Sequence, residues 1–235
     1  MLVAGFPAGA WGTNCYVLAP GPGQECVVVD PGQDAAPGVE DVVREHRLRP
    51  VAVLLTHGHI DHMWSVVPVC GAHDVPAYVH PDDRALLTDP GRGLSAETRE
   101  MLAGQLTGGT MTFSEPDDVR ELADDAQLEL AGLRIGVRHA PGHTGGSVTF
   151  GTEADGDDPS LLLSGDLLFR GGVGRSDLPG GDPDALLDSL GRVCLPLPDD
   201  TLVLSGHGPE TTIGHERATN PWLREVAARR PEDVR

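Results

Sequence analysis

The sequence predicts an α/β fold, and three features of the chain support this prediction. Short apolar runs recur between turns that contain Gly or Pro, and several of them lack polar alternation, as strands buried on both faces do. Helical candidates lie between these runs, which is the order expected of a mixed chain. The 31 Gly and 20 Pro residues also favour a fold rich in turns over a helical bundle.

Strands are expected where the apolar runs are short and rich in Val and Leu. These runs cover residues 16–19, 26–29, 51–55, 76–79, 133–137, 148–150, 161–163 and 202–204. Helices are expected at residues 39–47, 61–70, 81–87, 95–106, 182–193 and 220–229. The helix at 182–193 opens with Asp-Pro-Asp, which is typical of a helix start. Residues 88–118 are the least regular stretch, and a variable loop is expected there rather than a lid.

The length and charge of the chain restrict its organisation and its partners. A chain of 235 residues fits a single domain, expected over residues 1–235. Acidic residues number 36 and basic residues 17, all of them Arg, which gives a formal net charge of −19. Such a surface repels a phosphate backbone, so no nucleic-acid partner is expected. A small-molecule substrate is the expected partner, and the oligomeric state is left open.

The cysteines and the start of the chain indicate a cytoplasmic protein. The four cysteines, Cys15, Cys26, Cys70 and Cys194, show no metal-ribbon or redox spacing and are expected to be small buried side chains. Few cysteines fit a reducing compartment. Residues 1–10 lack the positive charge of a signal peptide, and no apolar run approaches the roughly 18 residues of a membrane span. No membrane association is therefore expected.

Four predicted strands end in polar residues that enter a turn with Gly or Pro. These residues are Asp30, His57, Asp166 and His207. Functional groups in α/β proteins often gather at the carboxyl ends of strands, because the loops there are held by a rigid sheet. The four side chains are therefore expected to face one site.

The strongest local signal is the motif Thr-His-Gly-His-Ile-Asp-His at residues 56–62. In an extended chain, residues two apart point to the same side, so His57 and His59 can bind one ion. If a helix starts near Asp61, that residue and His62 diverge by about 100° and can reach a neighbouring ion. The helix N-terminus would favour an ionised Asp61 and a neutral His62, which are the forms that bind metal.

Three candidates further along the chain complete the donor set. His143 lies in a tight turn at residues 140–147, while Asp166 and His207 each end a strand. A single His is more often structural than a ligand, but the first motif favours a shared metal site. The donors include no Cys, and imidazole with carboxylate is a ligand set that zinc accepts.

This ordered set of motifs resembles the metallo-β-lactamase superfamily. It consists of Thr-His-x-His-x-Asp-His, Gly-His-Thr, Ser-Gly-Asp and Gly-His-Gly, spread over about residues 14–223. Residues 165–177, 206–214 and 216–222 are similar, more specifically, to the short bacterial glyoxalase II-like (hydroxyacylglutathione hydrolase-like) hydrolases. The resemblance implies a four-layer α/β/β/α sandwich without the C-terminal helical domain of the long glyoxalase II enzymes.

The resemblance also implies two divalent metal ions, Zn²⁺ in the first place, with Fe or Mn as alternatives. The first ion would take His57, His59 and His143, the second Asp61, His62 and His207, and Asp166 would bridge them. Asp30 is either a residue that orients a ligand His or a cap of its turn.

The activity implied is hydrolysis of a hydroxyacyl thioester of a small thiol, similar to S-lactoylglutathione, by a hydroxide that bridges the metals. Asp61 is the candidate catalytic residue, because it can hold the proton of that hydroxide. Arg175, Arg170 and Arg217 are candidates for binding an anionic substrate group.

Other readings stay open. A mononuclear iron persulfide dioxygenase would hold its iron with His57, His143 and Asp166, a ligand arrangement that leaves room for oxygen. A non-catalytic metal-binding protein is the alternative of another class, although structural zinc sites are usually closed and often rich in thiolates. A β-lactamase or a nuclease of the same superfamily is a further, weaker reading.

Overall fold

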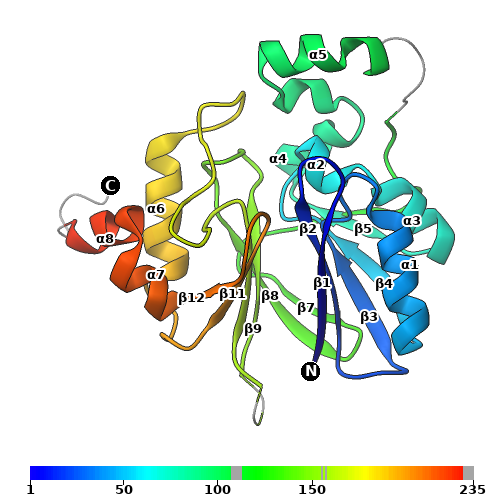
Figure 1. Cartoon of the computed structure of the whole chain (residues 1–235), viewed down its shortest axis with the longest axis horizontal. Coiled ribbons are helices and arrows are strands. Elements are labelled where there is room, and N and C mark those ends of the chain that lie inside the picture. Colours follow the sequence, from blue (N-terminus) through cyan, green and yellow to red (C-terminus); the bar gives the residue numbers. More distant parts are fainter. Residues whose placement is uncertain (107–112, 155, 157, 230–235) are drawn as a thin grey trace.

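Two β-sheets pack face to face, and helices cover the outer face of each sheet (Figure 1). This arrangement is seen in a computed structural model of the chain, which describes residues 1–106, 113–154, 156 and 158–229. Each sheet has six strands. The α/β class and the α/β/β/α sandwich expected from the sequence are confirmed.

The first sheet combines an antiparallel and a parallel half. Its strands, in spatial order, are β1 (Leu2–Ala8), β2 (Thr13–Ala19), β3 (Glu25–Val29), β4 (Arg49–Leu54), β5 (Ala77–Val79) and β6 (Val119–Glu121). The pairs from β1 to β3 are antiparallel, and those from β3 to β6 are parallel. Helices α1 (Ala35–His46) and α3 (Val66–His73) lie on the outer side of this sheet (Figure 1).

The second sheet follows the first along the chain. Its strands are β7 (Gln127–Leu130), β8 (Leu133–His139), β9 (Val148–Thr152), β10 (Leu161–Gly165), β11 (Leu202–Ser205) and β12 (Thr211–Thr212), and they stand side by side in sequence order. The β10–β11 pair is parallel, and the other pairs are antiparallel. Helices α6 (Pro183–Cys194), α7 (Ile213–Thr219) and α8 (Pro221–Ala228) cover its outer side.

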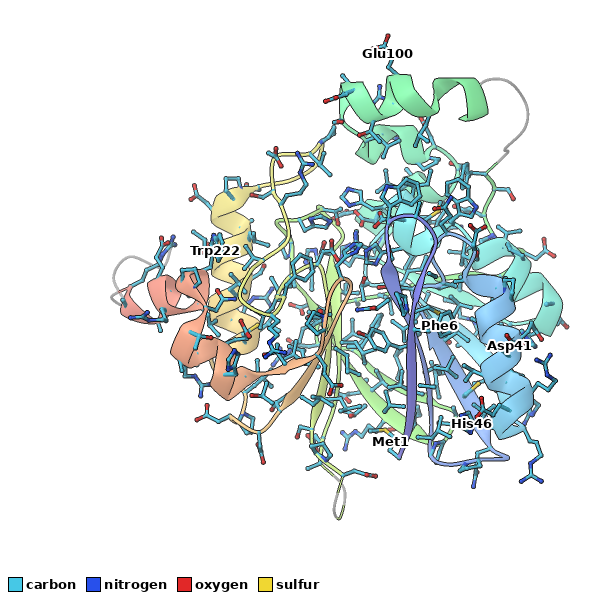
Figure 2. All side chains as sticks on the ribbon, in the orientation of Figure 1. Met1, Phe6, Asp41, His46, Glu100 and Trp222 are labelled. Atoms are coloured by element: carbon cyan, nitrogen blue, oxygen red, sulfur yellow. The ribbon has the colours of Figure 1, made fainter. Side chains whose placement is uncertain are left out.

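Three apolar layers separate the four layers of secondary structure, and the side chains between the two sheets fill the middle one (Figure 2). Successive side chains of a strand point to opposite faces. In β3, Val28 therefore packs toward α1 and α3, while Val27 and Val29 pack between the sheets. In β10, Leu162 faces the helices of the second sheet, and Leu161 packs between the sheets. Because both faces of these strands are buried, their sequences are apolar runs without polar alternation.

Short helices gather at one end of the sandwich. They are α2 (Ile60–Met63), α4 (Pro81–Arg84), the 3₁₀ turns η1 (Ala85–Leu87) and η2 (Pro90–Gly93), and α5 (Ala96–Leu106). Figure 1 shows α2 and α4 next to the end of the first sheet, with α5 above them. The residues that follow β3, β4, β10 and β11 leave their strands near this end.

The eight predicted strands are all present, but two predicted helices differ from the structure. The helix expected at residues 61–70 is divided into α2 and α3. At the break, the backbone N–H of Ser65 donates to the carbonyl of Pro31 (2.9 Å), and its hydroxyl donates to that of Gly32 (2.7 Å). The backbone N–H of Ser65 is therefore not used for a hydrogen bond within the helix, and the helix is interrupted there. The helix expected at 81–87 continues after α4 as the turn η1.

The expectation of a loop at residues 88–118 was wrong in part. This stretch contains η2 and α5, and α5 matches the helix candidate at 95–106, while residues 107–112 lie outside the described residues. Six elements of the described part of the chain had not been predicted, namely β1, β6, β7, β12, α7 and η2. In the described part of the chain, every helix is too short or too polar to span a bilayer.

Candidate metal centre

A cluster of three buried histidines lies where the ends of the two sheets meet. His57 and His59 follow β4 of the first sheet, and His143 lies in the turn between β8 and β9 of the second. Their exposed fractions are 1%, 5% and 3%. Nδ1 of His59 lies 2.8 Å from Nε2 of His143, and the three residues offer ligand atoms within 4.8 Å of one another. We call this set the three-histidine cluster.

A second cluster lies beside the first and is more open to solvent. Oδ2 of Asp61 lies 3.2 Å from Nε2 of His207, and Nε2 of His62 lies 3.4 Å from the same nitrogen. His62 is fully buried, but the side chains of Asp61 and His207 are 19% and 30% exposed. The open side of the site is therefore at this second cluster.

Asp166 lies between the two clusters. Its Oδ1 is 3.3 Å from Nε2 of His62, and its Oδ2 is 3.5 Å from Nε2 of His143 and 3.7 Å from Nε2 of His207. One carboxylate thus contacts both clusters, which is the position that the sequence resemblance implied for a bridging ligand.

The convergence of these groups fits a pair of metal ions. Buried polar atoms normally have hydrogen-bond partners. Here Nε2 of His57 and Oδ1 of Asp166 are buried without one, and Nδ1 of His59 faces Nε2 of His143. Imidazole nitrogens and carboxylate oxygens are donors that suit zinc and iron. Cations held by these donors would satisfy groups that the protein itself leaves unpaired.

The far side of several imidazoles is fixed by the protein. Nδ1 of His62 lies 3.0 Å from Oδ2 of Asp30, and Nδ1 of His143 lies 2.6 Å from the carbonyl oxygen of Arg175. Carboxylate and carbonyl oxygens only accept, so each Nδ1 carries a proton and Nε2 is the nitrogen left to bind a metal. Asp30 therefore orients a candidate ligand instead of only capping its turn.

Asp30 also reaches His57 through Thr56. The Thr56 hydroxyl donates to Oδ2 of Asp30 (2.6 Å), and its oxygen lies 3.1 Å from Nδ1 of His57. Because that hydroxyl proton is used on Asp30, His57 donates from Nδ1, which leaves its Nε2 unprotonated. The backbone N–H of Thr56 donates to Oδ1 of Asp30 as well (2.8 Å), so this carboxylate is fixed at both oxygens.

The electrostatics of the three-histidine cluster favour neutral imidazoles at His57 and His59. Burial lowers the pKa of His57 and His59, and the neighbouring imidazoles lower it further, to about 3 for His59. Burial raises the pKa of Asp61, but His62 and His207 outweigh burial and lower it below its usual range. Neutral imidazoles and an ionised carboxylate are the forms that bind metal.

His62 departs from the expectation that the helix N-terminus makes it neutral. Burial lowers its pKa, but the carboxylates of Asp61, Asp166 and Asp30 outweigh burial and raise it. These carboxylates act more strongly than the four-residue helix α2. A cation held by the same carboxylates would displace the proton from Nε2.

The backbone at Gly206 lies very close to two of the candidate ligands, and only a residue without a side chain fits there. A Cβ atom placed on Gly206 would lie 2.2 Å from Oδ1 of Asp166 and 2.6 Å from the His62 ring. Beside it, Thr13 of β2 pairs with His207 as an isolated bridge, and the backbone N–H of Asn14 donates to the carbonyl of Gly206 (2.8 Å). Strand β2 of the first sheet thus holds the two residues that follow β11 of the second.

The three candidate arginines differ in their surroundings. The Arg175 side chain is exposed and paired with Asp177 (Nε to Oδ1, 2.7 Å). Arg170 is exposed and follows Phe169, whose ring centroid lies 6.0 Å from that of His207. Arg217 contacts Asp199 and donates to the carbonyls of Leu195 (3.1 Å) and Leu197 (2.8 Å). These contacts indicate a structural role, so they give the substrate-binding expectation for Arg217 no support.

Two residues of the site had not been singled out from the sequence. The Thr13 hydroxyl donates to Oδ2 of Asp61 (3.0 Å), and the Phe169 ring contacts His207 edge to face. Thr13 comes from a segment 48 positions away, so no local spacing could reveal its contact. Phe169 lies only three residues after Asp166, which is a weak signal of proximity.

Another group of possible ligands, His80, Asp82 and His139, lies outside this centre. The rings of His80 and His139 are stacked, with centroids 4.1 Å apart and planes within 6° of each other. An imidazole binds a metal in its own ring plane, and two parallel planes share no point. The two histidines therefore cannot hold one ion in this arrangement.

A four-layer sandwich with His and Asp donors clustered where both sheets end defines a class of metal-binding α/β proteins. A sequence profile described as the metallo-beta-lactamase superfamily matches residues 8–207. The chain therefore belongs to the metallo-β-lactamase superfamily.

Relatives of similar length support this assignment. An uncharacterized protein of Mycobacterium tuberculosis is 47% identical over 95% of this chain and 98% of its own length. The probable metallo-hydrolase YqgX of Bacillus subtilis is 36% identical (93% of this chain, 95% of YqgX). The hydroxyacylglutathione hydrolase GloC of Haemophilus influenzae is 30% identical (93% of this chain, 96% of GloC).

Solved structures give the same fold. BLEG-1, a B3 metallo-beta-lactamase, has a TM-score of 0.80 and 39% identity, covering 94% of this chain and 99% of its own. TTHA1623 in a di-iron-bound form has a TM-score of 0.72 and 37% identity (95% and 100%). ETHE1 from Myxococcus xanthus has a TM-score of 0.72 at 21% identity (100% and 95%), which is evidence for the fold alone.

Proposed function

We propose that this protein is a metal-dependent hydrolase that cleaves a hydroxyacyl thioester of a small thiol, of the S-lactoylglutathione type. The observation that carries the proposal is the pair of donor clusters with Asp166 between them. The similarity to hydroxyacylglutathione hydrolase GloC supports the substrate class.

The site has places for two divalent ions. His57, His59 and His143 would hold one, Asp61, His62 and His207 would hold the other, and Asp166 would contact both. When bound, the two ions polarise a carbonyl oxygen and lower the pKa of water. Zn²⁺ is our first choice because the donors are imidazole and carboxylate, and iron is the main alternative because TTHA1623 is described as di-iron-bound.

Side chains and backbone groups of the protein position the substrate, the attacking hydroxide and the candidate ligands. The substrate approaches from the side of Asp61 and His207, since the three-histidine cluster is buried. Asp61 accepts a hydrogen bond from the attacking hydroxide and so holds its proton, and the hydroxyl of Thr13 fixes the Asp61 carboxylate for this task. Asp30 and the Arg175 carbonyl keep the His62 and His143 rings in place.

A thioester suits this set of residues because a thiolate leaves without help from a strong general acid. Arg170 and Arg175, both exposed and near residues that contact the site, are our proposed contacts for an anionic group of the thiol. Arg can bind a carboxylate with two hydrogen bonds. A small thiol of a reducing cytoplasm would be the carrier.

Hydrolysis of a β-lactam is the second candidate. It is favoured by the 39% identity and the TM-score of 0.80 to BLEG-1, which is described as a B3 metallo-beta-lactamase. An amide nitrogen is a poorer leaving group than a thiolate and needs a proton as it leaves. The two candidates therefore differ in the acid that they require.

The test is metal analysis of the purified protein together with a substrate panel. The panel contains S-lactoylglutathione, hydroxyacyl thioesters of other small thiols, a β-lactam, and a persulfide assayed by oxygen uptake. Two ions per chain with selective thioester cleavage support the proposal. Selective β-lactam opening supports the second candidate.

Two other outcomes contradict the proposal. One iron per chain with oxygen uptake would indicate the persulfide dioxygenase. A fully loaded protein that turns over no member of the panel would indicate a non-catalytic metal-binding protein.

A further inference from the structure

Asp83 of helix α4 is buried, and its carboxylate accepts hydrogen bonds from two separate segments of the metal centre. The residue is 2% exposed. Its Oδ2 accepts from the backbone N–H of Gly58 (2.8 Å) and from the hydroxyl of Thr144 (2.7 Å). Its Oδ1 accepts from the backbone N–H of Gly146 (2.8 Å). No ion pair among the described residues includes Asp83.

The donors flank the ligands of the three-histidine cluster. Gly58 stands between His57 and His59, four residues after the end of β4 in the first sheet. Thr144 follows His143 in the turn of the second sheet, and Gly146 lies two residues further on. One carboxylate thus joins the two backbone segments that carry the three rings.

The backbones come close enough for this contact only because both segments carry glycine. A Cβ atom on Gly146 would lie 2.7 Å from the backbone nitrogen of Asp83, and one on Gly58 would lie 2.9 Å from its carbonyl oxygen. A buried carboxylate is costly unless it is fully hydrogen-bonded. Hydrogen bonds to an ionised group are short and strong, so they fix the two segments firmly.

We propose that Asp83 is the positioning residue of the three-histidine cluster, and that it sets the affinity for the ion held there. It holds Gly58 and the Thr144–Gly146 turn at the spacing at which His57, His59 and His143 converge. The inference rests on the proposed two-ion centre. Asp83 is not a ligand and acts through the backbone of its neighbours.

The second cluster has other supports. Asp61 is held by the hydroxyl of Thr13, and His62 is held by Asp30. The two sheets are also joined near the site by a bond from the backbone N–H of Val148 to the carbonyl of Thr56 (2.7 Å). Loss of the Asp83 carboxylate is therefore expected to weaken one ion site and to leave the other ion site and the fold in place.

The test is a Co²⁺ titration of the metal-free wild type and of Asp83→Asn, followed by visible absorption and by competition with a chelator. Asp82→Asn is the matched control, because it removes the same charge from the same helix at a side chain that is 64% exposed. Asp83→Asn is expected to weaken one Co²⁺ site by about 10–100-fold, the usual effect of losing a group that orients metal ligands. Asp82→Asn is expected to bind both ions as the wild type does.

Two further variants keep the test informative. Thr144→Val removes one of the three donors, and we expect a smaller loss at the same site. If Asp83→Asn does not fold, Thr144→Val alone decides, and unchanged Co²⁺ binding overturns the inference. In a His59→Ala background, where the cluster is already broken, Asp83→Asn is expected to add little, because the two changes act on one site.

The remaining outcomes separate this inference from the proposed function. Wild-type affinities at both sites in Asp83→Asn would overturn the inference and leave the two-ion centre intact. So would an equal loss at both sites together with a lower melting temperature of the metal-free variant, since that would mean a purely structural role. A wild type that binds no Co²⁺ would remove the metal centre and the proposed function together.

Discussion

Oδ2 of Asp30 lies 3.0 Å from Nδ1 of His62, although 32 positions separate the two residues in the sequence. The same oxygen accepts the hydroxyl proton of Thr56, whose oxygen contacts Nδ1 of His57. Asp30 therefore orients one ring of each cluster. Its backbone is in the left-handed region (φ 49°), which is unusual for a residue other than glycine and is common at functional sites.

Replacing Asp30 with Ala is expected to weaken binding of both ions by about 10–100-fold, because His57 and His62 both lose their orientation. Chelator competition measures the effect. Asp34→Ala is the matched control, since Asp34 is also left-handed (φ 57°) but exposed and makes no side-chain cap bond. Equal losses in the two variants would mean that backbone strain, and not ring orientation, causes the effect.

His59→Ala and Asp166→Ala are each expected to abolish hydrolysis together with metal loss. His59 belongs to the three-histidine cluster, and Asp166 contacts both clusters, so either change leaves an incomplete ligand set. The measurement is metal content per chain together with the rate of thioester cleavage. Full turnover by either variant would rule out the proposed metal centre.

The strands that hold the site could be predicted because their burial is local in sequence. Strand β10 begins with three leucines, both faces of this run are covered in the structure, and Asp166 directly follows the strand. Strand β1 was missed because it is an edge strand with alternating burial and contains Pro7, a residue tolerated at a sheet edge. Its pattern of alternating buried and exposed residues, interrupted by Pro7, differs from the unbroken apolar runs by which the other strands were predicted.

What depends on distant contacts could not be predicted. The break between α2 and α3 is set by bonds from Ser65 to Pro31 and Gly32, which no helix signal encodes. The contacts of Arg217 are likewise tertiary, so its type alone could not separate a substrate contact from a structural one. The contact of Asp83 with the turn that contains His143 could not be predicted either, because the two are far apart in the sequence and no motif links them.

Arg175→Ala is expected to raise KM more than it lowers kcat. The variant keeps the backbone carbonyl that fixes His143 and loses only the exposed guanidinium, so metal content should stay at the wild-type level. Steady-state kinetics with an anionic thioester measure the effect. Unchanged KM would show that the guanidinium serves only its pair with Asp177.

The four thiols are expected to be unreactive in the folded protein. All four cysteines are buried, and burial raises the pKa of Cys26, Cys70 and Cys194 to about 12. The thiolate is the reactive form, so a raised pKa lowers reactivity at pH 8. A chromogenic disulfide reagent should detect four thiols after denaturation and almost none before it. Rapid labelling of the native protein would contradict this burial.

Gly206→Ala is expected to abolish metal binding while the protein still folds. The added Cβ would lie 2.2 Å from Oδ1 of Asp166 and 2.6 Å from the His62 ring, so the two donors must move apart. Gly172→Ala is the control, because a Cβ there meets no atom within 4 Å. Circular dichroism reports folding, and Zn²⁺ content after dialysis reports the site. Wild-type Zn²⁺ content in Gly206→Ala would mean that Asp166 and His62 need not approach each other as closely as the structure has them.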